Sequence, residues 1–295
     1  MKPARIYQHY VWIVNTLRQY KKLTLAQINE LWMKDMVSDG NKLERTSFFR
    51  HKDAILSMFG IIIECDEKSH KYYIANPEVL GDDSMEGWML STLTVNAVLA
   101  DSLSLRDYIL LENVPAGQEF LQTIILAIKT KRRIKIQYQK FGFEAGEKVI
   151  APYALKLFHQ RWYLLSHTGN HFATYSLDRM QQVQITDETF EMPANFKPEQ
   201  YFTEYFGVLT DETPMAHVVV RAYGKTANYL RTLPLHHSQQ ELEQTPDYTE
   251  FAFDIRPTYD FIGQLLSHGD GIEVISPTDV REKMRQKIAD NLKRY

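Results

Sequence analysis

The spacing of apolar residues changes twice along this 295-residue chain, and this change limits the fold more than any other feature. Up to about residue 130, apolar residues recur mainly every three or four positions, as on one face of a helix. Between 131 and 192 they alternate, as on a half-buried strand. From 207 to 295, strand-like and helix-like segments follow each other. One core does not fit three patterns, so we expect a multidomain α+β protein.

Residues 1–78 are predicted to form a winged helix-turn-helix domain. Helical spacing covers 3–20, a second helix begins after the candidate N-cap Thr24, and a third covers about 42–58. Two β-rich runs at 61–65 and 71–75 then flank a polar turn, which predicts a hairpin. Three helices followed by a hairpin within about 75 residues is the outline of this class of DNA-binding domain.

The third helix offers hydroxyls and cations of the kind that contact phosphates and base edges in a major groove. The predicted DNA-binding residues on this helix and on the hairpin are Arg45, Thr46, Ser47, Arg50, His51, Lys52, Lys68 and Lys71. The alternative is a solvated polar face on a small helical domain.

Charge is distributed unevenly. Residues 1–75 contain 12 Lys/Arg against 8 Asp/Glu, and 131–190 contain 9 against 5. Residues 79–130, an acidic region of helical pattern broken at Pro115, are predicted to be a helical connector that packs on its neighbours or on a second subunit. The two basic blocks are therefore the better candidates for contact with phosphate.

Residues 131–192 contain several short strand candidates separated by Gly and turn residues, which predicts a small antiparallel barrel. Four motifs occur in order: IKIQY at 134–138, IAPYAL at 150–155, Trp-Tyr-Leu at 162–164 and YSLDRM at 175–180. In these motifs the segment resembles the WYL domain. The whole chain resembles WYL-domain transcriptional regulators, which carry a winged helix-turn-helix in front and an extension called WCX behind.

The resemblance implies a Sm-like, SH3-type β-barrel that senses a ligand, often a nucleotide or a fragment of nucleic acid, in a protein that is usually a homodimer. It places the ligand-facing side chains at Tyr138, His159, Arg161, Tyr163 and Arg179. Arginines would clamp phosphate and tyrosines would offer a ring for stacking. Lys148 stands where relatives often have arginine, which could weaken a bidentate phosphate contact. Three of these residues could instead be structural: Arg179 in an ion pair with Asp178, His159 as a solvated loop residue and Tyr138 as a barrel tyrosine with its hydroxyl at the rim.

Residues 207–295 are predicted to form a WCX-like α+β sandwich. Strand candidates at 217–222 and 272–275 and a pair flanking Pro246 alternate with helix candidates at 226–233, 259–266 and from Pro277.

These features predict a DNA-binding transcriptional regulator whose WYL domain senses a phosphorylated or nucleic-acid ligand and modulates binding to a double-stranded DNA operator. The alternative is an accessory nucleic-acid-binding protein, for example in phage defence, without direct promoter control. No nucleophile with a base, metal-ligand motif or phosphate loop is present, so we expect neither an enzyme nor a cofactor or metal. With Cys65 as its one cysteine and no signal-peptide or spanning pattern, we expect a cytoplasmic protein without a membrane partner. The homodimer is expected from the resemblance, and because two DNA-binding heads on a two-fold axis would read a pseudo-palindrome.

Overall fold

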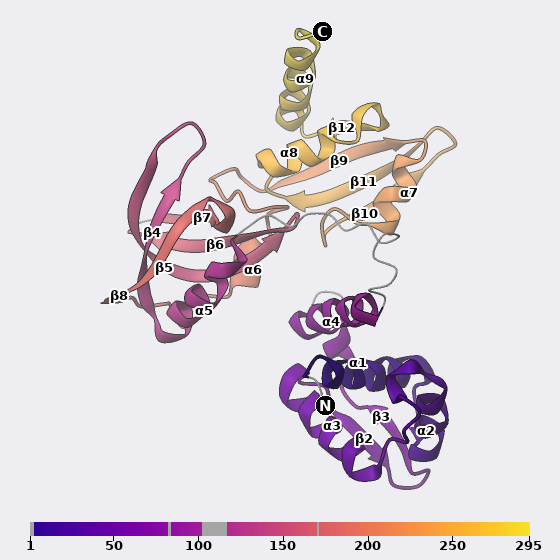
Figure 1. The fold of residues 1–295 in the computed structure, drawn as a ribbon. Helices are drawn as coiled ribbons and strands as arrows, with labels where there is room; N and C mark the ends of the chain where they lie inside the picture. The colour runs from indigo at the N-terminus through magenta and orange to yellow at the C-terminus, as the bar shows by residue number, and fades with distance from the viewer. Residues whose placement is uncertain (1–2, 82–83, 102–116, 170) are drawn as a thin grey trace. The chain divides into compact units, whose positions relative to one another are not determined.

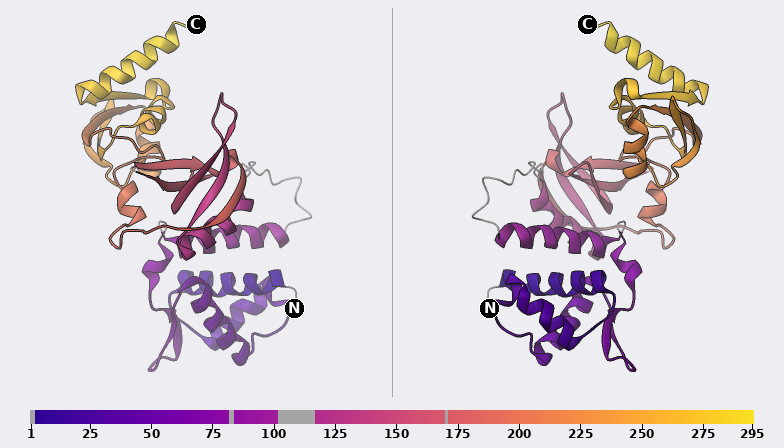
Figure 2. Two further views of the ribbon diagram at one scale, coloured as in Figure 1. Left: turned by 90° about the vertical axis from the view of Figure 1, so that its left-hand side faces the viewer. Right: turned by 90° about the vertical axis from the view of Figure 1, so that its right-hand side faces the viewer.

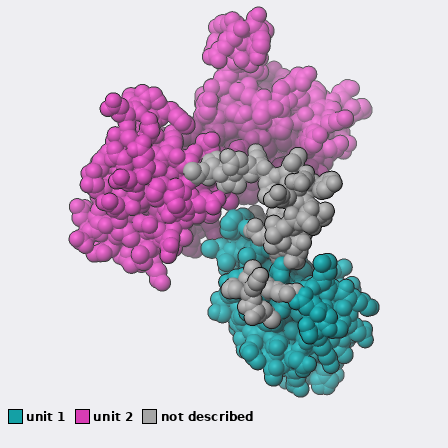
Figure 3. Space-filling view, in the orientation of Figure 1, with its two compact units in different colours: residues 1–112 teal, residues 113–295 magenta. Residues whose placement is uncertain are grey.

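A computed structural model describes residues 3–81, 84–101, 117–169 and 171–295. The chain divides into two compact units, residues 1–112 and 113–295 (Figure 3), and each is described by itself. Within the described ranges, no helix combines the length and the apolar character needed to cross a membrane.

The first unit surrounds a small antiparallel sheet with helices (Figure 1). Its helices are α1 (Pro3–Tyr20), α2 (Leu25–Lys34), α3 (Arg45–Phe59) and α4 (Met85–Asp101), with short 3-10 turns at Met36–Ser38 and Pro77–Leu80. Its strands are β1 (Leu23–Thr24), β2 (Ile63–Asp66) and β3 (Lys71–Ile74), in the order β1-β3-β2.

One hydrophobic core joins these elements. Val14 of α1, Ile28 of α2 and Phe48 of α3 are among its most buried members, and α4 packs against α1. Thr24 is the N-cap of α2, as predicted, and forms a capping box with Gln27. The predicted hairpin is also present as β2 and β3, which pair from Ile63 with Ile74 to Asp66 with Lys71.

The predicted helical connector is only partly observed. Its first half is α4, whereas residues 102–116, with the expected break at Pro115, lie outside the described residues. Its last part, α5 (Leu121–Thr130), belongs to the second unit and packs against β4, β5 and β8.

Five strands follow α5 and form one antiparallel sheet, here called the WYL-motif sheet. They are β4 (Arg132–Gln139), β5 (Ala145–Phe158), β6 (Arg161–Thr168), β7 (His171–Ser176) and β8 (Met180–Thr189). Strand β5 pairs with β4 in its first half and with β6 in its second half, with a register shift between Pro152 and Ala154. The strands consequently cross one another in Figures 1 and 2 instead of lying flat.

The prediction of a closed barrel is wrong for this sheet. Its strand order is β7-β6-β5-β4-β8, and among the described residues no pairing joins the two edge strands. The chain passes from β7 to β8 through the 3-10 turn η5 (Leu177–Arg179), which takes no part in the ladder. The sheet is therefore curved but open.

The C-terminal part is a second antiparallel sheet with its helices on one face. The elements are β9 (Ala216–Tyr223), α7 (Thr226–Thr232), β10 (Gln240–Gln244), β11 (Tyr248–Ile255), α8 (Tyr259–Leu266), β12 (Ile272–Ser276) and α9 (Thr278–Leu292). Their order matches the predicted order, and the strand order β10-β11-β9-β12 is that of a ferredoxin-like β-α-β-β-α-β arrangement. Val218 and Val220 of β9 pack with Leu230 of α7 and Phe261 of α8.

A short segment, residues 206–209, ties the two sheets of the second unit together; we call it the strap. The Lys156 ammonium donates to the Gly207 carbonyl at 2.7 Å, and the Thr174 hydroxyl donates to the Val208 carbonyl at 3.0 Å. On the other side, the Asp260 carboxylate accepts the N–H groups of Val208 and Leu209, each at 2.8 Å. A Cβ atom on Gly207 would collide with that carboxylate.

Lys156 is partly buried at this junction. Its ammonium lies 4.2 Å from the centre of the Phe202 ring, and Asp260 attracts it electrostatically. Burial lowers its pKa from the ordinary value of 10.5 to about 8. The strap is thus held by one desolvated cation and one carboxylate from opposite sides.

The burial of His51 predicts that the first unit loses stability in mild acid. The His51 ring lies 5.3 Å from the rings of His9 and Tyr10, and burial, followed by the charges of His9 and Arg50, lowers its pKa to about 4. The unfolded chain, with a His pKa near 6.5, binds a proton between pH 6.5 and 4 that the folded unit does not. This histidine alone should therefore lower the stability of the first unit by roughly 3 kcal/mol over the whole window, and by about 2 kcal/mol between pH 7 and pH 5.

Urea unfolding of the full chain, followed by tryptophan fluorescence at pH 7 and pH 5, measures this loss. Three of the four tryptophans, Trp12, Trp32 and Trp88, lie in the first unit. His51→Gln should flatten the dependence of the unfolding free energy on pH. The matched variant His236→Gln changes a buried histidine of the second unit whose pKa is also about 4. It should leave the pH dependence of the unfolding of the first unit unchanged. Equal pH dependence in wild type and His51→Gln would contradict the prediction.

Candidate nucleic-acid interface and ligand cavity

The start of α3 is positioned by hydrogen bonds from α2. The Asn29 amide donates to the Leu43 carbonyl at 3.0 Å and accepts the Leu43 N–H at 2.8 Å. The Trp32 indole N–H donates to the Asn41 carbonyl at 2.9 Å. Because Asn29 and Trp32 are themselves buried, the connection between α2 and α3 has one defined path.

The predicted DNA-binding residues of α3 fall on two faces of the helix. Arg45, Thr46 and Arg50 are exposed, and Ser47 and Lys52 are partly exposed. The prediction that His51 lies on the polar face is wrong, because it is only 9% exposed and faces the core. The spacing from Phe48 through His51 to Ile55 follows the buried stripe of the helix.

A partly exposed ring, Phe49, lies between the cations of this face. The Arg45 guanidinium is 5.6 Å and the Lys52 ammonium 6.0 Å from its centre. The Phe49 ring also contacts Tyr72 of β3 at 6.4 Å between centroids, which joins the helix to the hairpin. Arg45 and Lys52 therefore pack near a ring that is itself held against the hairpin.

The hairpin presents Lys68 at its exposed tip and Lys71 partly exposed at the start of β3. Its turn is held by Asp66, which accepts the N–H groups of Lys68 at 3.1 Å and Ser69 at 2.8 Å. Hydrogen bonds from Ser69 lower the pKa of Asp66 below its ordinary value. Lys22, which the sequence analysis did not select, lies 3.9 Å from Asp66 and 4.6 Å from the Tyr73 ring.

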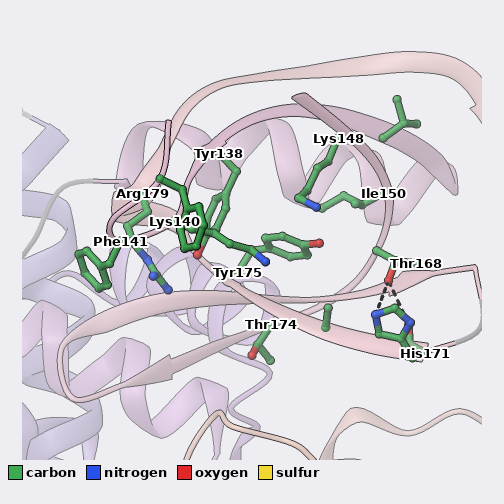
Figure 4. Close-up of a pocket in the computed structure, with 13 residues that line it drawn as sticks. Tyr138, Lys140, Phe141, Lys148, Ile150, Thr168, His171, Thr174, Tyr175 and Arg179 are labelled. Atoms are coloured by element: carbon green, nitrogen blue, oxygen red, sulfur yellow. Dashed lines mark hydrogen bonds between the residues drawn. The ribbon is translucent and has the colours of Figure 1, made fainter. Parts of the chain in front are cut away.

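A cavity of about 700 Å³ opens on the WYL-motif sheet (Figure 4). It is bounded by strands β4, β5 and β7, by the end of β6, by the loop between β4 and β5, and by η5. The lining residues that carry its chemistry are Tyr138, Lys140, Phe141, Phe143, Lys148, Thr168, His171, Tyr175 and Arg179. Figure 4 shows Arg179 beside Phe141 at one end and His171, bonded to Thr168, at the other.

The lining carries positive charge without a neutralising carboxylate. Lys140, Lys148 and Arg179 contribute cations, whereas no Asp or Glu lines the cavity. Within the described residues, none of these three cations forms an ion pair. The Arg179 guanidinium lies against the rings of Phe141 at 4.6 Å and Tyr138 at 5.3 Å, and its buried Nε has no hydrogen-bond partner. A cluster of this kind favours an anionic ligand.

Two buried tyrosines, one on β4 and one on β7, meet in the lining although two strands separate them in the sheet order. The rings of Tyr138 and Tyr175 pack edge to face at 4.9 Å. Burial raises the pKa of both hydroxyls, and for Tyr138 the charge of Arg179 opposes that rise. Both phenols are therefore neutral at physiological pH and can donate hydrogen bonds.

The structure brings only two of the five predicted ligand residues into the cavity, Tyr138 and Arg179. Arg161 instead lies 3.5 Å from the carboxylate of Asp178, which also accepts the Ser176 hydroxyl.

His159 and Tyr163 also lie away from the lining. The His159 ring is exposed in the turn after β5 and stacks on Phe158 at 4.0 Å. Tyr163 is half-buried on β6 and is not among the lining residues. A ligand-binding role for His159, Arg161 and Tyr163 stays a prediction.

The sequence analysis missed the loop residues Lys140, Phe141 and Phe143, and also His171 and Tyr175. A signal was available for the loop, because KFGF places two aromatic residues and a cation around a glycine. Lys148 was noted for its position alone, and the structure places it in the lining opposite Ile136 of β4. In the described part of the chain, no three His, Cys, Asp or Glu side chains gather as metal ligands do.

Comparison with known families assigns both parts of the second unit. The WYL domain model matches residues 119–185, and the WCX domain model matches residues 214–291. The second unit therefore contains a WYL domain followed by a WCX domain, as the sequence analysis predicted.

Solved structures give distant matches. One is proteasome accessory factor B/C of Arthrobacter aurescens, at 18% identity and a TM-score of 0.38, covering 95% of this chain. This chain spans 46% of the length of that protein. Another is a CRISPR Cas-related protein, at 17% identity and a TM-score of 0.41, covering 86% of this chain and 74% of the other. No curated protein matches the chain.

The different settings of Arg161 and Arg179 generate a prediction about ligand binding. Arg179→Ala should weaken binding of an anionic ligand, because it removes a cation that faces the cavity. Arg161→Ala should leave affinity near the wild-type value and cost at most about 1 kcal/mol of stability, because its pair with Asp178 is partly exposed.

Calorimetric titration of the full chain with mixed nucleotides and short oligonucleotides measures the affinities, and thermal unfolding measures the stabilities. Lys131→Ala, an exposed cation at the end of α5, is the charge-matched control. A larger loss of affinity in Arg161→Ala than in Arg179→Ala would contradict the assignment.

Proposed function

We propose that this protein is a DNA-binding transcriptional regulator without enzymatic activity. Its first unit would bind a duplex operator as a winged helix-turn-helix, and its WYL domain would hold a phosphorylated or nucleic-acid ligand that modulates operator binding. The observation that carries the proposal is the exposed start of α3, where Arg45, Thr46 and Arg50 stand together on a helix fixed by Asn29.

The geometry of the first unit suits insertion of α3 into a major groove. Residues near the N-terminus of a recognition helix contact base edges, while a neighbouring hairpin contacts the backbone. Lys68 at the hairpin tip and Lys22 beside Asp66 supply cations for such backbone contacts. Phe49 and Tyr72 join the helix to the hairpin, so both would approach DNA as one rigid surface.

The cavity supports a sensing role for the WYL domain. It offers three cations, two neutral phenols and no carboxylate, which suits binding of a phosphorylated ligand. A ligand can change operator binding only to the extent that it prefers one arrangement of the protein.

Replacing Arg45 and Arg50 together with alanine should weaken operator binding. Each arginine should contribute about 1–3 kcal/mol if it reads a base, or about one unit of the salt slope if it holds a phosphate. Fluorescence anisotropy over a range of salt concentrations, with a duplex selected by the protein from a random pool, measures both quantities.

Lys225→Ala/Arg285→Ala is the matched control, because it removes two exposed cations from the C-terminal domain. It should change neither affinity nor slope by a comparable amount. If the Arg45→Ala/Arg50→Ala protein binds the selected duplex with wild-type affinity and slope, α3 is not the reading helix.

We also propose that the protein acts as a homodimer. A single α3 reaches few base pairs, and two such helices on a two-fold axis read a pseudo-palindrome with useful affinity. Light scattering at micromolar concentration should give about twice the mass of the 34.6 kDa chain. A monomer mass both with and without the selected duplex would exclude this arrangement.

A further inference from the structure

The first unit has a cavity of its own, of about 410 Å³, between the end of α1, strand β3 and the 3-10 turn η2 (Pro77–Leu80). We call it the α1 cavity. Its floor is apolar, because Leu17 of α1 and Leu80 of η2 are buried core residues that also line it, and Ile74 of β3 is half-buried in the lining. A cavity of this volume can hold a small organic molecule.

The rim of the α1 cavity is cationic. Arg18, Lys21 and Lys22 are exposed and line it, whereas no Asp or Glu of the described residues does. Within the described part of the chain, the side chains of Arg18 and Lys21 form neither an ion pair nor a hydrogen bond. A cation in the last turn of a helix stabilises that helix, which accounts for Arg18, but Lys22 lies beyond the end of α1. An apolar floor below such a rim suits an amphipathic anion.

The α1 cavity and α3 lie on opposite faces of the hairpin. Successive side chains of a strand point to opposite sides of a sheet. Tyr72 of β3 is buried against Phe48 of α3, at 4.8 Å between ring centres, whereas the next residue, Tyr73, lines the cavity. A ligand would therefore have room in the cavity while α3 contacts DNA.

Lys22 links the α1 cavity to the hairpin. Its ammonium lies 4.6 Å from the centre of the Tyr73 ring and 3.9 Å from Oδ2 of Asp66. Oδ1 of the same carboxylate accepts the N–H groups of Lys68 and Ser69, which hold the hairpin turn. An anion in the cavity would therefore compete with Asp66, and with any DNA phosphate nearby, for this one cation.

We propose that the α1 cavity binds a small amphipathic carboxylate, an aliphatic or aromatic acid, and that the bound acid weakens DNA binding by pairing with Lys22. The apolar body of the acid would cover Leu17, Ile74 and Leu80, and its carboxylate would meet the rim. The binding site stands independently of the proposed function. The effect on DNA rests on that function, because the acid would take from DNA a cation assigned there to backbone contact.

The DNA backbone is the competing partner of the rim cations. A chain of phosphate and sugar has no apolar body to cover Leu17 and Leu80, so the floor would stay in contact with water. The face of the hairpin away from α3 is also the less accessible one to a duplex that α3 reads. Both observations favour the acid.

Calorimetric titration of the full chain with octanoate tests the site. Acetate carries the same charge without the apolar body, and octylammonium carries the same body with the opposite charge. Octanoate should bind at least roughly tenfold more tightly than acetate, because each buried methylene adds to the affinity. It should also bind at least roughly tenfold more tightly than octylammonium, which the cations repel. Equal affinities for the three probes, or no binding of octanoate, would overturn the inference.

A pair of variants locates the bound octanoate on the first unit. Arg18→Gln/Lys21→Gln should weaken octanoate binding by roughly tenfold and leave the protein folded, because both side chains are exposed. Lys34→Gln/Lys42→Gln is the matched control, since it removes two exposed cations of the same unit that do not line the α1 cavity. It should bind octanoate as the wild type does. Thermal unfolding checks that all of these proteins are folded.

The cavity of the WYL-motif sheet is the other cationic site that octanoate can reach. Lys140→Ala/Lys148→Ala removes two cations from its lining and should leave octanoate binding unchanged. If this variant loses octanoate and Arg18→Gln/Lys21→Gln does not, the acid occupies the second unit and the inference is overturned.

Fluorescence anisotropy with a duplex selected by the protein measures the effect on DNA. Saturating octanoate should lower duplex affinity and reduce the salt slope by about one, because one cation is withdrawn from the backbone. Lys22→Gln should bind the duplex more weakly from the start, and octanoate should weaken it no further. By linkage, the duplex should lower the affinity for octanoate by the same factor.

The outcomes separate this inference from the proposed function. If octanoate binds at the α1 cavity but duplex affinity does not change, or changes equally in Lys22→Gln, the effect through Lys22 is refuted. If Arg18→Gln/Lys21→Gln lowers the salt slope while octanoate fails to bind, the rim belongs to the DNA backbone and the inference is overturned. If the protein selects no duplex, the proposed function fails, and calorimetry alone decides the site.

Discussion

The WYL domain depends on a single strand, β5, being shared by two halves of one sheet. Its residues up to Ile150 pair with β4 and those from Ala151 with β6, and the register shifts at Pro152, whose missing N–H interrupts the ladder. This bend lets Lys148 of β5 and Tyr175 of β7 line the same hollow. In a flat sheet β6 would separate them. The cavity thus follows from where one proline falls in a fourteen-residue strand.

The distribution of charge over this sheet gives the cavity its character. The carboxylates of Glu147, Asp178, Asp187 and Glu188 each lie within ion-pair distance of a cation outside the cavity. Such partly exposed pairs add little stability. Their importance is instead in where they lie. Because these carboxylates are paired with cations outside the cavity, the cations that line the cavity have no acidic partner. The same arrangement explains why Arg161, which precedes Trp162, and Arg179, which lies in the YSLDRM motif, have different surroundings.

Sequence predicted those parts of the molecule that depend on local pattern. The N-cap at Thr24, the hairpin and the order of elements after residue 215 follow from local spacing. The resemblance named both Tyr138 and Arg179, and the structure places both in the lining of one cavity. What failed depends on contacts distant in sequence. His51 is polar, yet it has the same helical spacing as Phe48 and Ile55 and is buried with them on the core-facing side of α3. Alternation along β7 and β8 does not reveal whether edge strands pair, and η5 keeps them apart. The ion pair of Arg161 with Asp178 could not be predicted either, because it depends on the position of η5 beside β6.

The strap limits where a domain junction can be placed in a chimeric protein. The WYL model ends at 185 and the WCX model begins at 214, so a reader of the family boundaries would treat residues 186–213 as a spacer of free length. Yet Val208 gives its carbonyl to the WYL domain and its N–H to the WCX domain, and Gly207 has no room for any side chain. An insertion or deletion within the strap would break the hydrogen bonds of Val208 to Thr174 and to Asp260. A chimera that exchanges the C-terminal domain must therefore carry Gly207 and Val208 together with Asp260, and keep Thr174 and Lys156 on the other side of the join.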